Sequence, residues 1–184
     1  MLGFVPVTHT TWAAWRELHP DTLVLDKHDR SSRDSYQSYY GNGSAGVIGE
    51  SVRDERLPRK ERVVGVAGST GVKAYPFSAL ELTLVVNDSF ADLDVVVFLD
   101  APTQTGLAYS RTVDGRTLTF DLAPYGGGIQ TAFVDRENGS QWLALTGRAI
   151  SGEMKDATLE RVLSHLSFWF AWTDWNPDTA LYGD

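Results

Sequence analysis

Eight polar or aromatic residues stand at the ends of expected strands or in turns, where a β scaffold presents side chains to a cleft. They are Tyr75, Asn87, Asp88, Asp100, Thr103, Arg111, Asp135 and Trp142. A carboxylate pair such as Asp100 and Asp135 divides the acid and base roles of a catalyst when burial raises the pKa of one of them. The interpretation that we favour is structural: Asp88 and Asp135 cap turns, and Arg111 pairs with one of them.

Asp100 follows the most apolar run of the chain (VVVFL), so we expect it at the end of a strand. It should cap the next turn, which Pro102 stiffens and in which Thr103 bonds to Asp100 or to the backbone. The alternative is that Asp100 acts as an acid, a base or a metal ligand in a pocket beside Arg111, Asp135 or a histidine.

Motifs for metal binding and nucleophilic catalysis are missing from the sequence. The histidines, which lack HExxH and HxH spacing, are His9, His19, His28 and His165. The densest group of potential ligands, residues 26–29 (DKHD), is typical of a surface loop. There is no Gly-x-Ser-x-Gly elbow and no P-loop, and Ser69 falls in an expected hairpin turn. We therefore assign no catalytic residue and expect no metal or cofactor.

Six tryptophans suggest a platform that stacks on sugar rings. Five of them fall at helical spacing near the two ends of the chain, which is how a helix buries its core face. These five are Trp12, Trp15, Trp169, Trp172 and Trp175. Core packing is the favoured interpretation for them. Trp142 follows the Asn138-Gly139 turn and is the best candidate for an exposed ring that contacts a ligand.

The elements that must position these residues are short β-type runs between two helices. The expected strands are Val63–Ala67, Val72–Tyr75, Leu82–Val86, Val95–Asp100, Leu107–Thr112, Arg116–Leu122 and Ile129–Val134. Helices are expected at Thr11–His19 and His165–Asn176. The pattern predicts an α+β, β-dominated fold: a twisted antiparallel sheet or partly closed barrel flanked by two short Trp-rich helices.

An internal repeat relates the two ends of the chain. Val5–Leu25 aligns with Val162–Tyr182, and the identities include both tryptophans of Trp-x-x-Trp and the triplet Pro-Asp-Thr. Each copy predicts a helix that stops before the proline and continues into a short extended segment. We expect residues 1–26 to be the end of a preceding repeat unit, 27–61 a linking or wrapping loop, and 62–184 a complete β-rich unit, all in one compact domain.

Charge and composition exclude two classes of partner. The 184 residues carry a net charge of −8, and a negative field opposes binding to a phosphate backbone, so no nucleic-acid partner is expected. No apolar run approaches the ~20 residues of a membrane span, and the first residues lack a signal-peptide pattern, so we expect a soluble chain. Cysteine is absent, which removes thiol chemistry and leaves the compartment undetermined.

Several motifs carry a resemblance that covers nearly the whole chain. Lys73-Ala74-Tyr75-Pro76, Asn87-Asp88, residues 135–147 and the two Trp-x-x-Trp…Pro-Asp-Thr segments resemble the bacterial and archaeal family catalogued as domain of unknown function 3179. Typical members carry Cys-Pro-x-Cys-Gly-Ser after the valine-rich strand; here Asp100 and Thr103 stand at the cysteine positions. The resemblance implies a fold and frequent export, but no defined activity, and a thiol role does not carry over.

We interpret the chain as a second, cysteine-free repeat unit that serves as a non-catalytic binding or assembly module. The alternative is a hydrolase-like or metal-dependent enzyme with a carboxylate cluster around Asp100 and Asp135. Convergence of these two residues with Thr103 and Arg111 in one cleft would favour the enzyme, and an open polar surface would favour the module. The expected partner is an upstream repeat unit or a second copy of this chain.

Overall fold

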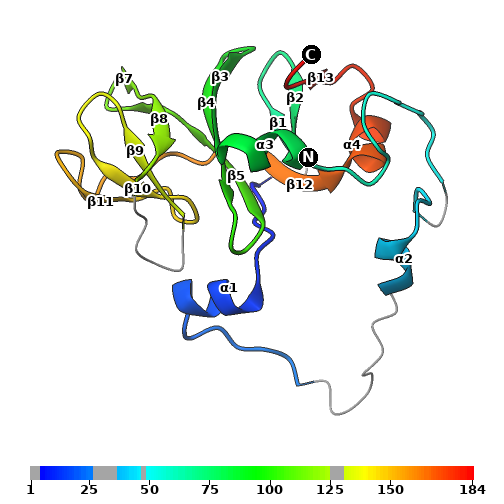
Figure 1. Cartoon of the computed structure of the whole chain (residues 1–184), viewed down its shortest axis with the longest axis horizontal. Helices are drawn as coiled ribbons and strands as arrows, with labels where there is room; N and C mark the ends of the chain where they lie inside the picture. Colours follow the sequence, from blue (N-terminus) through cyan, green and yellow to red (C-terminus); the bar gives the residue numbers. More distant parts are fainter. Residues whose placement is uncertain (1–4, 27–36, 47–48, 125–130) are drawn as a thin grey trace.

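The computed structural model describes residues 5–26, 37–46, 49–124 and 131–184. Short strands form twisted sheets here, with short helices around them (Figure 1). The helices are α1 (Trp12–Leu18), α2 (Gln37–Gly41), α3 (Phe77–Thr83) and α4 (Trp169–Trp175). The strands are β1 (Arg62–Ala67), β2 (Val72–Pro76), β3 (Val85–Phe90), β4 (Leu93–Asp100), β5 (Thr105–Ser110), β6 (Thr112–Val113), β7 (Arg116–Thr117), β8 (Phe120–Leu122), β9 (Ala132–Asp135), β10 (Gln141–Leu143), β11 (Ala149–Ser151), β12 (Ser164–Phe168) and β13 (Ala180–Leu181).

The strands of the described residues form four sheets. Their orders are β12-β1-β2-β13, β11-β10-β9-β8, β3-β4-β5 and β6-β7. All pairs are antiparallel except β13 with β2, which is parallel. The β-dominated α+β class and the twisted antiparallel sheets are therefore confirmed, whereas none of these sheets closes into a barrel.

Strand β4 separates two hydrophobic cores because successive side chains of a strand point to opposite faces. Val96 and Phe98 enter one cluster, while Val95, Val97 and Leu99 enter the other. All five side chains are fully buried. An apolar run without polar alternation, as in VVVFL, is the pattern of a strand that is covered on both faces.

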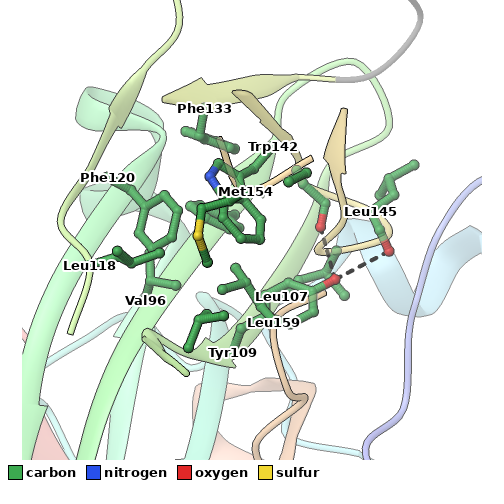
Figure 2. Close-up of a cluster of buried hydrophobic side chains, with 14 of the residues drawn as sticks. Val96, Leu107, Tyr109, Leu118, Phe120, Phe133, Trp142, Leu145, Met154 and Leu159 are labelled. Atoms are coloured by element: carbon green, nitrogen blue, oxygen red, sulfur yellow. Dashed lines mark hydrogen bonds between the residues drawn. The ribbon is translucent and has the colours of Figure 1, made fainter. Parts of the chain in front are cut away.

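The first core is built from aromatic rings of several sheets (Figure 2). Phe98 stacks on Phe133 with ring centroids 4.1 Å apart, and Phe120 meets Phe98 edge to face. The hydroxyl of Tyr109 donates to the carbonyl oxygens of Ala144 and Leu145. Burial raises the pKa of Tyr109 to about 12, so this phenol stays protonated as a donor.

Helix α4 covers the sheet that contains β1, and a glycine makes this possible. A Cβ atom on Gly65 would lie 2.1 Å from the indole of Trp172, so the ring occupies the place of a side chain. Trp169 and Trp172 are buried with Val63 in a third cluster. The Trp172 Nε1–H donates to Thr179 Oγ1 at 2.8 Å, which fixes the chain after the helix.

Helix α1 has two different faces. Ala14 is buried in the first core and Leu18 packs against the same core. Trp12 lies on the opposite side of the helix, since residues of an α-helix are about 100° apart, and it is 50% exposed. The expectation that both Trp-rich helices bury a Trp pair against a sheet is thus confirmed for α4 and wrong for α1.

Several expected elements differ from the structure. The expected strand Arg116–Leu122 is divided into β7 and β8, which belong to different sheets. The segment His165–Asn176 begins as strand, because β12 pairs with β1 from Phe168 opposite Arg62, and the helix starts only at Trp169. The expected strand Leu82–Val86 starts instead at Val85, after helix α3, whose capping residue Leu84 has a left-handed φ of 60°. Pairing with β1 overrides the local helix propensity at β12. Ile129 and residues 126–128 lie outside the described part.

The predicted loop 27–61 contains helix α2, in which Tyr40 is 64% exposed. Tyr39 and Tyr40 both meet the ring of Phe168 edge-on or tilted, with centroids 6.4 and 6.3 Å away. The ammonium group of Lys60 lies 3.7 Å from the centre of the Tyr39 ring. Tyr36 lies outside the described residues.

The buried and exposed tryptophans of α4 provide a matched pair of substitutions. We expect Trp172→Ala to lower the free energy of unfolding by about 3–5 kcal/mol, because it empties a large aromatic site over Gly65. Trp175→Ala should change it by less than about 0.5 kcal/mol, because Trp175 is 87% exposed. Urea unfolding measures both. Equal effects of the two substitutions would show that Trp172 is not part of the core.

Candidate functional site

The predicted site residues occupy three separate places rather than one cleft. Arg111 lies beside the first residues of β4, where its backbone N–H donates to the carbonyl of Asp94. Asp100 ends the same strand six residues later, roughly 20 Å away at about 3.3 Å per residue. Asp135 belongs to β9 in another sheet. The convergence that would favour an enzyme is not formed among these residues.

The first place is an ion pair between β2 and β3. Lys73 Nζ lies 2.7 Å from Asp88 Oδ2, and the hydroxyl of Tyr75 donates to the same oxygen at 3.0 Å. Tyr182 stacks on the buried Tyr75 ring. Burial, and then the charge of Asp88, hold the pKa of Tyr75 far above its usual value, so this phenol cannot act as a base at neutral pH. Lys73 was missed as a member of the group, although it is on the same face of the strand as Tyr75, two residues away.

Asn87 and Arg111 hold the sheets together. The Asn87 carboxamide exchanges two hydrogen bonds with the backbone of Phe120, each 2.8 Å, and so stands in for a strand pair between β3 and β8. Arg111 donates to the carbonyl of Leu118 and lies 3.4 Å from Asp94. The expected ion pair of Arg111 with Asp88 or Asp135 is wrong: Arg111 contacts only the backbone carbonyl of Asp88, at 3.4 Å.

The second place surrounds Asp100, which is fully buried. Its Oδ1 accepts the backbone N–H of Thr131 at 2.6 Å, and its Oδ2 accepts the hydroxyl of Thr103. Thr103 lies 2.7 Å from Thr105 Oγ1, which donates to Thr10 at 2.9 Å. The predicted bond between Thr103 and Asp100 is confirmed, and the carboxylate caps its own turn and holds it to Thr131.

The third place is the turn after β9. Asp135 accepts the backbone N–H of Asn138 and the indole N–H of Trp142, both at 2.8 Å. The cap predicted for Asp135 is confirmed. The exposed ring predicted for Trp142 is wrong, because Trp142 is fully buried in the first core and meets Phe120 edge-on. A buried indole needs a hydrogen-bond acceptor, and Asp135 supplies it.

The described part of the chain has no preformed set of metal ligands. No group of three or more histidine or carboxylate side chains is placed to hold an ion there. His28 and Asp29 of the predicted loop cluster lie outside the described residues. The described helices also include none that is long and apolar enough to cross a membrane.

The most unusual surface belongs to the segment that sequence reasoning placed in the core. We call residues 12–25 the first motif and residues 169–182 the second motif. Both begin with a seven-residue helix, and the residues that end these helices have nearly the same backbone angles, φ −134° and ψ 71° at His19 against φ −135° and ψ 65° at Asn176. Trp15 donates to Thr22 at 2.9 Å as Trp172 donates to Thr179 at 2.8 Å.

The two motifs differ in what surrounds them. The second is packed on the sheet, whereas the first buries Ala14 and packs Leu18 but leaves its other aliphatic side chains and Trp12 largely in solvent. The exposed fractions in the first motif are 50% for Trp12, 94% for Leu23, 65% for Val24 and 82% for Leu25. These four exposed apolar side chains distinguish the first motif from the second. The sequence alignment could have indicated this surface, because it matches Leu23–Leu25 with Ala180–Tyr182. Ala180 and Leu181 of the second segment pair with β2, whereas the first segment is exposed.

Comparison with known proteins identifies one family. Residues 1–179 match the model of the family described as "Protein of unknown function (DUF3179)". No curated protein and no solved structure matches the chain.

Substitution of Asp100 separates a cap from a reactive group. Asp100→Asn keeps an oxygen for the Thr131 N–H and should lower the free energy of unfolding only slightly, whereas Asp100→Ala leaves buried donors unpaired and should cost about 1–3 kcal/mol. Chemical denaturation measures both. Saturable binding of a divalent metal or a small anion that vanishes in Asp100→Asn, with the circular dichroism spectrum unchanged, would contradict the cap.

Proposed function

The chain belongs to the DUF3179 family, and we propose that this member is a non-catalytic binding or assembly module whose binding element is the first motif. The observation that carries this proposal is the pair of motifs with one geometry and two environments. One copy packs its tryptophans on a sheet, and the other presents the equivalent Trp12 to solvent.

The state of the carboxylates supports a module rather than an enzyme. Both oxygens of Asp100 and both oxygens of Asp135 accept hydrogen bonds from groups that belong to the fold. A general base or acid needs an oxygen within reach of a substrate proton. Since the two residues also lie in different sheets, they do not form the carboxylate cluster on which the enzyme alternative depends.

The hydrogen bonds of the first motif support a preformed binding element. Thr11 caps α1 by accepting the N–H of Ala14, and Trp15 is bonded to Thr22, so the helix and the following turn are fixed without a partner. Binding by a preorganised element loses less conformational entropy than binding by a flexible segment. The other face of the helix, with Ala14 and Leu18, anchors the motif to this chain.

A two-unit chain tests the proposal. An additional copy of residues 49–161 is joined to the N-terminal side of Val5. Val5–Leu25 then follows this added unit as Val162–Tyr182 follows residue 161 in the existing unit. Arg16→Thr is included because the equivalent Thr173 is buried. We expect hydroxyl-radical footprinting to show a several-fold lower oxidation rate of Trp12 than in the one-unit protein that carries the same Arg16→Thr. Oxidation of Trp12 at the same rate in the two proteins would overturn the assembly role.

A further inference from the structure

Resting on the assembly role proposed above, we infer that the first motif recognises a β-hairpin of defined chemistry in a second β unit of this fold. The first strand of that hairpin has a glycine under Trp15, and its second strand has a free edge that pairs with residues 23–25. The motif is thus the specificity-determining part of an interface between two β units.

The requirement for a glycine in the partner hairpin is inferred from how the second motif packs on β1. The hairpin of β1 and β2 is covered by α4, and the Trp172 ring lies against the backbone of Gly65, with three ring carbons within 2.5 Å of an added Cβ. Side chains of any size at this place would push the ring off the sheet. The second tryptophan of Trp-x-x-Trp can therefore dock only where the sheet has a glycine.

The requirement for a free strand edge is inferred from β13, the short strand after α4. Ala180 and Leu181 pair in parallel with Lys73 and Ala74 of β2, and the N–H of Tyr182 donates to the carbonyl of Ala74 at 2.9 Å. Backbone hydrogen bonds of this kind add a strand to a sheet whatever the side chains are, which is a common mode of recognition. Leu181, which is buried, supplies the apolar contact.

The first motif offers the same groups, with Trp15 partly buried beside His19 and residues 23–25 exposed. Trp15 corresponds to Trp172, Val24 to Leu181, and Leu25 to the residue that donates to β2. Residues 23–25 have no strand partner among the described residues. An exposed run of three aliphatic residues with unpaired backbone groups is a ready template for strand pairing.

The faces of α1 show how one helix joins two units. Ala14 and Leu18 pack on the first core of this chain, and Trp12 faces away from it. In α4 the tryptophan face is buried, and Trp175, which corresponds to Leu18, is 87% exposed. Each helix thus uses one of the two contacts, and a helix that uses both would lie between two β units.

The partner is a different unit from the one in this chain. A second copy of the chain cannot receive the first motif, because its own Trp172 covers Gly65 and its own β13 pairs with the edge of β2. Arg16 also stands where the second motif has the buried Thr173, whose hydroxyl bonds back to the helix carbonyls. The hairpin that receives the first motif must leave room for a guanidinium group beside the glycine.

The two-unit chain described above tests this recognition with two variants and one matched control. Gly65→Val in the added unit should restore the oxidation rate of Trp12 to that of the one-unit protein, because the valine side chain occupies the space on β1 that the Trp15 ring needs. Gly71→Val in the added unit is the control, since a Cβ there meets nothing within 4 Å. It should leave Trp12 protected.

The second variant acts on the motif itself and leaves the added unit intact. Leu25→Pro removes the N–H that corresponds to the Tyr182 donor, and we expect the amide of Leu23, which corresponds to Ala180, to exchange hydrogen several-fold faster than in the unsubstituted two-unit chain. In the one-unit protein the substitution should change nothing, because Leu25 is 82% exposed.

The outcomes separate this inference from the assembly role. Protection of Trp12 that survives Gly65→Val as well as it survives Gly71→Val would overturn the recognition and leave the assembly role standing. Unprotected Trp12 in the unsubstituted two-unit chain would overturn both. A one-unit protein that forms a dimer in solution with Trp12 protected would show that a second copy is the partner, and would overturn the choice of an open-edged unit.

Discussion

The contact between Trp172 and Gly65 sets the arrangement of the sheet that carries both ends of the β-rich unit. Because β1 has no side chain at this position, a large ring can lie directly on the backbone, and α4 can approach the sheet closely. The same ring donates to Thr179, which directs the chain to the free edge of β2. One segment therefore covers a face of the sheet and closes its edge, and it leaves no unpaired strand edge at β2.

The geometry of the Trp-x-x-Trp motif is local, which explains why it can form twice. The bonds that shape it, from the tryptophan to the threonine and from the capping residue to the helix, join residues at most seven apart. Docking is not needed to form the turn, since the first motif has it while half exposed. A segment that is rigid before it binds is suited to holding β units together, and this separation of shape from docking is the physical basis of the proposed function.

Local pattern was enough to predict most strands, the β-dominated class and the caps at Asp100 and Asp135. VVVFL reads as a strand covered on both sides, and Asp100 after it bonds to Thr103 as expected. The errors concern tertiary context. Trp142 looked exposed because it follows a turn, but its ring is in the core and its N–H reaches Asp135. His165–Phe168 was predicted to be helical because it precedes two tryptophans, but it pairs with β1 as a strand. Burial of Trp12 could not be judged from spacing, since the same spacing serves a docked and an undocked helix.

Hydrogen exchange of the unmodified protein tests the central claim most directly, because it compares the two motifs in one sample. The account predicts that the amides of Leu23 and Leu25 exchange at the rate of an unprotected chain, while those of the equivalent Ala180 and Tyr182, held on β2, exchange far more slowly. Equal and strong protection of both segments would contradict the account, because the first motif would then already be docked.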